Sequence, residues 1–140
     1  MDCQSIPEMN IGEWGERLNT KLQGQRYPIS AIFELTDRCN FNCVHCYINQ
    51  SAVSKKALAE ELTTQQVEAI LDRIADAGCL YITFTGGEPL LRKDFPHIYR
   101  YTKSKGMLVK IFTNAALITP EFIELFTDLP PREIDITLYG

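Results

Sequence analysis

The sequence lacks several features that would place it in large classes of protein. It has no apolar run close to the ~18 residues of a membrane-spanning helix, and its start, Met1-Asp2-Cys3-Gln4, lacks the basic and apolar regions of a secretion signal. Its 14 basic residues are outnumbered by 18 acidic ones, and the net charge of −4 argues against a broad nucleic-acid surface. We therefore expect a cytoplasmic protein whose partners include neither a membrane nor a nucleic acid.

The cysteines are the most informative residues in the chain. Five cysteines, an odd number, occur without a secretion signal, which argues against a disulfide framework and favours metal binding. Three of them, Cys39, Cys43 and Cys46, follow an apolar strand-like run with the spacing C-x3-C-x2-C. Thiolates this close in a polar loop can converge on one point and bind a soft metal. Cys79 instead has the character of a small buried apolar residue.

The three clustered cysteines favour an iron–sulfur cluster, for which thiolate is the standard ligand. A four-iron cluster usually takes four such ligands, so a loop that supplies three leaves one iron with an open position for a small molecule. The alternative is a structural zinc site of the Cys3His type, completed by His45. Because His45 directly precedes Cys46, and adjacent residues rarely bind one tetrahedral ion together, the cluster is favoured.

Alternating strand and helix patterns predict an α/β fold. Apolar, β-prone runs predict strands at 30–36, 80–85, 107–113 and 133–138. Helical periodicity predicts helices from the capping box of Thr63 to Gly78, over 94–105, and from Thr119 to 129. We expect residues 1–29 to be an N-terminal extension with one short helix over 13–22, and 48–62 to be part loop and part short helix.

The order of these elements predicts parallel strands joined by right-handed helical crossovers. The last three strands begin at residues 80, 107 and 133, at intervals of 27 and 26 residues, as in a β/α barrel. The unusual segments 39–46, 86–89 and 113–114 each follow a strand directly, so they should meet at the C-terminal face of the sheet. Four strands cannot close a barrel, and we expect the chain to be part of a larger enzyme.

The cysteine loop and the downstream Gly86-Gly87-Glu88-Pro89 together resemble the radical S-adenosylmethionine (radical SAM) enzymes. The resemblance covers residues 30–140, and it implies the first four strands of a partial (β/α)6 TIM-like barrel. It also implies that Cys39, Cys43 and Cys46 hold a [4Fe–4S] cluster whose fourth iron binds the amino and carboxylate groups of S-adenosylmethionine. In this family the reduced cluster cleaves S-adenosylmethionine, and the resulting 5′-deoxyadenosyl radical abstracts hydrogen from the substrate.

The resemblance gives the glycine-rich segment, Gly86 to Pro89, the role of binding the amino group of S-adenosylmethionine. Glycines allow close approach of the backbone, and carbonyl oxygens with the Glu88 carboxylate would suit an ammonium group. The alternative is a tight turn in which Glu88 caps a local helix.

Four further residues are candidates for cofactor contacts. His45 and Tyr47 would stack on the adenine of S-adenosylmethionine or merely pack the loop. Asn114 lies in a Thr-Asn-Ala segment that resembles the family's Thr-Asn-Gly, with Ala115 where glycine is usual. Thr137 on the last strand would face the ligand or be a structural polar residue.

The loop Cys-Val-His-Cys-Tyr looks most like the subgroup with C-terminal auxiliary-cluster (SPASM-type) domains, which modifies peptides or proteins. The resemblance implies an electron donor of the flavodoxin or ferredoxin type and a peptide, protein or small-molecule substrate. The alternatives are a radical SAM enzyme of cofactor biosynthesis, of the molybdopterin or haem type, and a non-enzymatic zinc- or cluster-binding module.

Overall fold

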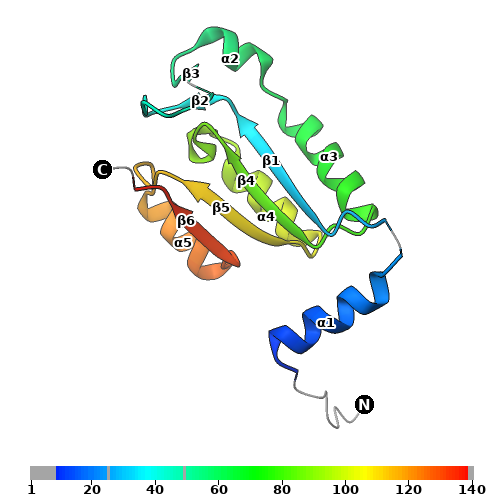
Figure 1. The fold of residues 1–140 in the computed structure, drawn as a ribbon. Helices are drawn as coiled ribbons and strands as arrows, with labels where there is room; N and C mark the ends of the chain where they lie inside the picture. The colour runs from blue at the N-terminus through cyan, green and yellow to red at the C-terminus, as the bar shows by residue number, and fades with distance from the viewer. Residues whose placement is uncertain (1–8, 25, 49, 139–140) are drawn as a thin grey trace.

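A central sheet of parallel strands organises the protein. The computed structural model describes residues 9–24, 26–48 and 50–138. Within them, β1 (Ser30–Thr36), β4 (Tyr81–Gly86), β5 (Leu108–Thr113) and β6 (Glu133–Ile136) pair in the order β1-β4-β5-β6, all parallel (Figure 1). The predicted α/β fold is thus confirmed, and the ends of these strands differ from the predicted ones by at most two residues.

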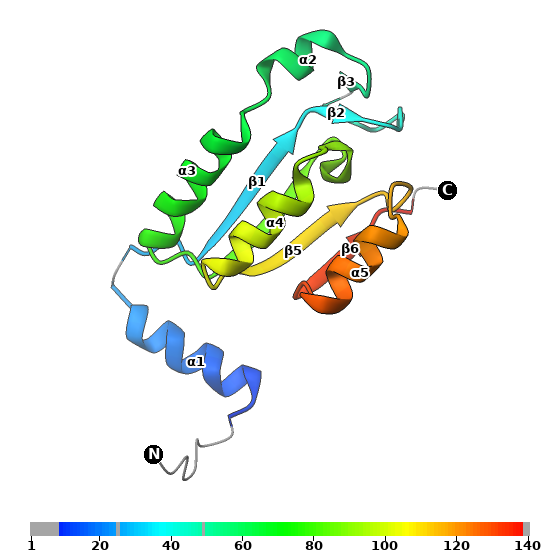
Figure 2. The same ribbon diagram turned by 180° about the vertical axis from the view of Figure 1, so that it is seen from behind.

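Helices α3 (Thr64–Asp76), α4 (Phe95–Ser104) and α5 (Pro120–Asp128) connect the strands and cover one face of the sheet (Figures 1 and 2). Their apolar faces and the inward side chains of the strands form a single core. Its fully buried members include Val67, Leu71, Ile82, Phe84, Phe95, Ile98, Tyr99, Val109 and Ile111.

The other face of the sheet is open in the described part of the chain. Because side chains alternate along a strand, the neighbours of the core residues point away from the helices. Ile32 on β1 is 76% exposed, Phe112 on β5 is 40% exposed, and Glu34 is also exposed. One covered face and one open face are what a β/α barrel wall presents to its helices and to its interior.

The predicted helix signals are confirmed with one exception. At α3 the capping box forms, with Thr63 Oγ1 accepting from Gln66 N at 3.3 Å and Thr63 N donating to Gln66 Oε1 at 2.8 Å. Gly78, with φ +93°, and Gly106, with φ +81°, follow the ends of α3 and α4 in the left-handed conformation that glycine favours. Thr119 occupies the predicted N-cap position of α5, but its side chain makes no capping hydrogen bond.

Smaller elements depart from the sequence-based expectation. Helix α1 (Ile11–Leu22) begins two residues earlier than predicted, because the Asn10 side chain caps it by accepting from Glu13 N at 2.9 Å. Helix α1 lies beyond the starting ends of the strands (Figures 1 and 2) and buries no residue. Its Ile11 and Trp14 line an open cavity together with Tyr81 and Leu108 at the starts of β4 and β5. The short helix expected within 48–62 is α2 (Lys55–Glu60). None of the helices in the described ranges has the length and apolar character needed to cross a bilayer.

Two very short strands were not predicted. They are β2 (Arg38–Cys39) and β3 (Gln50–Ser51), which pair in parallel on either side of the cysteine loop. Each has only two residues, too few for a periodic pattern to appear in the sequence. Their pairing closes the base of the loop at both ends.

The α3 capping box gives a direct stability prediction. We expect Thr63→Ala to lower the free energy of unfolding by about 1 kcal/mol, because it removes the acceptor for a helix N-terminal N–H group. Thr119→Ala is the matched control, and it should cost less than about 0.5 kcal/mol because that side chain caps no backbone group. Urea unfolding measures both, and equal losses would contradict the assignment.

Candidate metal and cofactor site

The glycine-rich segment is pressed against the start of the cysteine loop. A Cβ atom on Gly86 would lie 2.3 Å from the carbonyl oxygen of Thr36, and one on Gly87 would lie 2.3 Å from that of Arg38. In the same contact Gly87 N donates to Thr36 O at 2.7 Å, and Glu88 N donates to Arg38 O at 2.9 Å. The close approach that these glycines permit is therefore to the protein's own backbone, where no side chain fits.

Glu88 is completely buried, with 0% exposure. Its carboxylate accepts hydrogen bonds from Leu90 N at 3.0 Å, Thr113 Oγ1 at 2.8 Å and Asn114 N at 2.8 Å. The first of these caps the 3₁₀ helix η1 (Pro89–Leu91), so the local capping role considered for Glu88 is present in the structure. The other two tie the carboxylate to the end of β5, which the sequence did not reveal.

Asn114 brings the end of β5 to the cysteine loop. Its side-chain nitrogen donates to Asn40 Oδ1 at 2.8 Å and lies 3.8 Å from the sulfur of Cys39. Thr137 joins the same edge, since its backbone N donates to Thr113 O at 3.1 Å. Segments that are 74 and 75 residues apart in the chain thus meet at the carboxyl end of the sheet, as their positions after strands predict.

Ala115 has a backbone φ of +62°, in the left-handed region that residues other than glycine rarely adopt. It is the position at which the sequence departs from Thr-Asn-Gly. The chain follows the turn despite the alanine, and the backbone is strained there.

The three cysteines lie half-buried in the loop. Cys39 lines an open cavity of about 380 Å³ together with Phe41 and Ala52. A turn links two of them, with Cys46 N donating to Cys43 O at 3.0 Å. Among the described residues, no three His, Cys, Asp or Glu side chains are placed to hold one metal ion. By donor type, the three thiols fit an iron–sulfur cluster, which takes each cysteine sulfur on a different iron.

His45 and Tyr47 are exposed on the cysteine loop. The Tyr47 hydroxyl donates to Glu34 Oε1 at 2.7 Å and so tethers the ring to the open face of β1. This hydrogen bond, with burial and the negative charge of Glu34, raises the pKa of Tyr47. The Tyr47 side chain is 81% exposed, so its ring can be approached from solvent.

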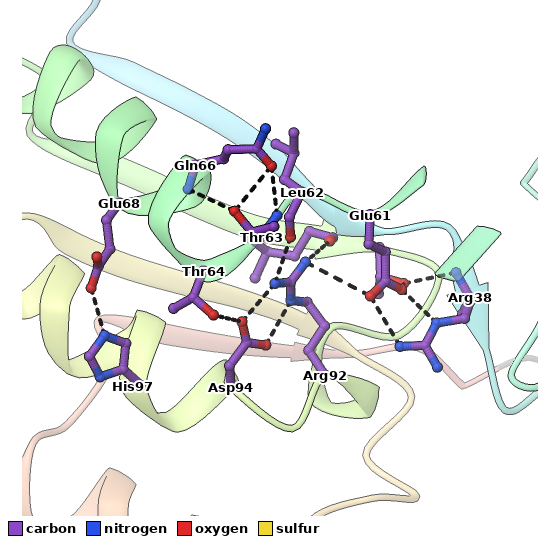
Figure 3. A network of polar contacts seen from close by, with 12 residues as sticks. Arg38, Glu61, Leu62, Thr63, Thr64, Gln66, Glu68, Arg92, Asp94 and His97 are labelled. Atoms are coloured by element: carbon purple, nitrogen blue, oxygen red, sulfur yellow. Dashed lines mark hydrogen bonds and ion pairs between the residues drawn. The ribbon is translucent and has the colours of Figure 1, made fainter. Parts of the chain in front are cut away.

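Arg38 clamps the base of the cysteine loop through its side chain (Figure 3). Its guanidinium donates to Glu61 Oε1 at 2.5 Å and Oε2 at 3.2 Å, and to Ala52 O at 3.1 Å. Glu61 also accepts from the hydroxyl of Thr36. The side chains of Arg38 and Glu61 thus join two segments to the start of the cysteine loop. Glu61 reaches Thr36 at the end of β1, and Arg38 reaches Ala52, the residue after β3.

A second ion pair extends this network toward α4 (Figure 3). Arg92, 5% exposed, forms a bidentate pair with Asp94 at 2.9 and 2.7 Å and donates to the carbonyls of Leu35 and Leu62, both at 3.0 Å. Arg92 Nη1 is also 4.0 Å from Glu61 Oε2. Two arginines and two acids therefore balance in charge, and their hydrogen bonds offset the cost of burying them. The sequence reasoning did not identify these residues, because pairs between distant segments leave no periodic pattern.

A protein-family profile described as the Radical SAM superfamily matches residues 33–140. Among curated proteins, the Fe-coproporphyrin III synthase of Methanosarcina barkeri is 35% identical over 109 residues, which are 78% of this chain and 27% of that protein. The PqqA peptide cyclase of Bradyrhizobium diazoefficiens is 29% identical over 113 residues, which are 81% of this chain and 29% of that protein. The chain thus spans less than one third of the length of these relatives.

Solved structures support the fold. Crystal structures of SuiB from Streptococcus suis, bound to S-adenosylmethionine or to the precursor peptide SuiA, match with TM-scores of 0.60 and 0.59. The sequence identities are 21% and 20%, and each match covers 96% of this chain and 30% of SuiB.

The strained backbone at Ala115 gives a stability prediction. We expect Ala115→Gly to raise the free energy of unfolding by about 0.5–1 kcal/mol, because relief of the left-handed strain outweighs the extra freedom of glycine in the unfolded chain. The control is Ala77→Gly at an exposed position with φ −74°, where no strain is relieved. It should lower stability by about 0.5–1 kcal/mol. If both substitutions destabilise equally in urea unfolding, the strain is not there.

The ionic network gives a pH prediction. Burial raises the pKa of Glu61, but hydrogen bonds from Arg38 and Thr36 outweigh it and hold the pKa below its ordinary value of 4.5. A carboxyl group with a depressed folded pKa stabilises the protein above the unfolded pKa and loses that contribution as pH falls through the folded one. The free energy of unfolding should therefore decline below about pH 4.5, and less steeply in Glu61→Gln.

Glu60 is the matched control, because it is the exposed neighbour of Glu61 in the sequence. Glu60→Gln should keep the acid dependence of the original protein. A Glu61→Gln profile parallel to the original between pH 5 and 3 would show that Glu61 is not the group responsible.

Proposed function

This chain belongs to the radical SAM superfamily, and we propose that it forms the first part of the catalytic core of an enzyme that modifies peptides or proteins. The superfamily uses a [4Fe–4S] cluster and S-adenosylmethionine. The observation that carries the proposal is the meeting of the cysteine loop, the glycine-rich segment and the end of β5 at one edge of a parallel sheet. A sensor or scaffold module would not require the second and third of these segments.

In this proposal Cys39, Cys43 and Cys46 are the cluster ligands. When bound, the cluster supplies the electron that cleaves S-adenosylmethionine into methionine and the 5′-deoxyadenosyl radical. The hydrogen bonds of Arg38 with Glu61 and Ala52 fix the loop at its base, beside the carboxyl edge of the sheet. Binding of the cluster would then draw the three thiolates together. Three protein ligands leave one position of the cluster for the amino acid part of S-adenosylmethionine.

The glycine-rich segment would bind the ammonium group of S-adenosylmethionine through backbone carbonyl oxygens. The Glu88 carboxylate contributes indirectly, because its oxygens are buried and accept three donors from the chain. Pro89, also buried, starts η1 and fixes the end of the segment. His45 and Tyr47, exposed beside the cysteines, would flank the adenine, and Thr137 would line the same edge.

The open face of the sheet favours a peptide over a porphyrin as the substrate. Lys110 on β5 pairs there with Asp135 at 2.8 Å and Glu133 at 3.2 Å, and Glu34 adds a third acid. Arg132, which lies over the ring of Tyr81, is a second base on this face. Three acids against two bases leave a net negative charge, which would disfavour the carboxylates of a porphyrin and accommodate polar or basic peptide groups. The PqqA peptide cyclase supports the peptide substrate, and the Fe-coproporphyrin III synthase supports a haem-type alternative.

A soluble one-electron donor, of the flavodoxin or ferredoxin type, would reduce the cluster. Such donors, and a cluster that must stay reduced, fit the reducing environment of the cytoplasm. We therefore propose a cytoplasmic location for the enzyme.

Anaerobic reconstitution tests the cluster assignment. The protein should incorporate about four irons per chain and acquire a visible absorption band, and Cys43→Ala should abolish both. Cys79→Ala is the matched control, because burial raises the pKa of the Cys79 thiol and its side chain packs in the core. It should retain the iron. One tightly bound zinc per chain in place of iron would favour the binding-module alternative instead.

A further inference from the structure

We propose that Asn114 tunes the reduction potential of the cluster through a hydrogen bond to the Cys39 sulfur, and that buried Glu88 acts through Asn114 as a positioning residue. This inference rests on the proposed function, in which Cys39 is a cluster ligand. It gives both residues a role in setting the electron affinity of the cluster rather than in holding S-adenosylmethionine.

The orientation of the Asn114 amide is fixed by the contacts around it. Its oxygen, Oδ1, accepts a hydrogen bond from Ala116 N at 3.0 Å. Turning the amide over would place its NH₂ group against that N–H, two donors facing each other. The NH₂ group must therefore point to the other side, where one hydrogen is donated to Asn40 Oδ1 at 2.8 Å and the other faces Cys39 Sγ at 3.8 Å.

Glu88 holds the backbone from which this amide projects. Its Oε2 accepts from Asn114 N, and its Oε1 accepts from Thr113 Oγ1, both at 2.8 Å. Thr113 Oγ1 in turn accepts from Ala115 N at 3.0 Å, within the strained turn. A completely buried carboxylate thus fixes three consecutive residues of the β5 end, and Asn114 is the one that reaches the cysteine loop.

Hydrogen bonds to cysteine sulfur are among the features that set the potential of iron–sulfur clusters. Cys39 Sγ accepts from Phe41 N at 3.4 Å as well as from Asn114. Both donors stabilise negative charge on the sulfur, and the reduced cluster carries more of that charge than the oxidised one. Asn114 therefore raises the potential and makes the cluster easier to reduce.

Anaerobic redox titration of the reconstituted protein, followed by EPR, tests this inference. At a fixed solution potential, Asn114→Ala should lower the ratio of reduced to oxidised cluster about 2- to 10-fold, the range expected for one hydrogen bond. Asn114→Asp should lower it further, because a carboxylate oxygen replaces the donor facing the sulfur. Asn19→Ala, on the exposed face of α1, is the control and should leave the ratio unchanged.

Glu88→Gln tests the positioning role in a double-mutant cycle. It puts a donor where Glu88 accepts from the β5 end, and it also removes a buried negative charge, which favours reduction equally in both backgrounds. The charge effect cancels in the cycle, so Glu88→Gln should shift the ratio further toward the oxidised cluster in the original protein than in Asn114→Ala. A residue that only supports the fold would change iron content or stability and would give additive effects.

The outcomes separate the two levels of the proposal. If the original protein takes up no cluster, the proposed function fails. If it takes up about four irons per chain and Asn114→Ala and Asn114→Asp both titrate like the original, the proposed function stands and the role of Asn114 is refuted. Equal effects of Glu88→Gln in both backgrounds would refute the coupling between Glu88 and Asn114.

Discussion

The backbone contact between Gly86-Gly87 and residues 36–38 is the constraint on which the site depends. Hydrogen bonds at 2.7 and 2.9 Å join the two segments, and the added Cβ positions at both glycines fall 2.3 Å from carbonyl oxygens. Any side chain at either position would separate the end of β4 from the start of the cysteine loop. The loop therefore takes its place from the sheet and not from its own sequence.

Arg38 connects this contact to the rest of the molecule. Its carbonyl faces Gly87 and Glu88, its side chain reaches Glu61 and Ala52, and Cys39 follows it in the chain. The ion pairs are largely buried, and each charge has hydrogen-bonding partners, so the network specifies one geometry. The side-chain contacts of Arg38 and the backbone contacts of Gly87 and Glu88 together hold the start of the cysteine loop at the carboxyl edge of the sheet.

The sequence was sufficient for the fold and for the meeting of the three candidate segments at one edge of the sheet. Periodic patterns, the Thr63 capping box and the regular strand spacing predicted the parallel sheet, and the rule that active sites lie after parallel strands placed the cysteine loop near Asn114. The sequence could not supply the Glu61 and Arg92 pairs, the burial of Glu88 or the contact of Asn114 with Cys39. Each of these depends on side-chain directions between segments far apart in the chain, which no local pattern encodes.

The most direct test of this account is the iron content of Gly87→Ala after anaerobic reconstitution, compared with that of Gly15→Ala, where an added Cβ meets nothing within 4 Å. If the glycine contact positions the cysteine loop, Gly87→Ala keeps the helices of the fold by circular dichroism but loses most of its iron, while Gly15→Ala keeps about four irons per chain. Full iron content in folded Gly87→Ala would show that the cysteines assemble without the contact, and would contradict the account.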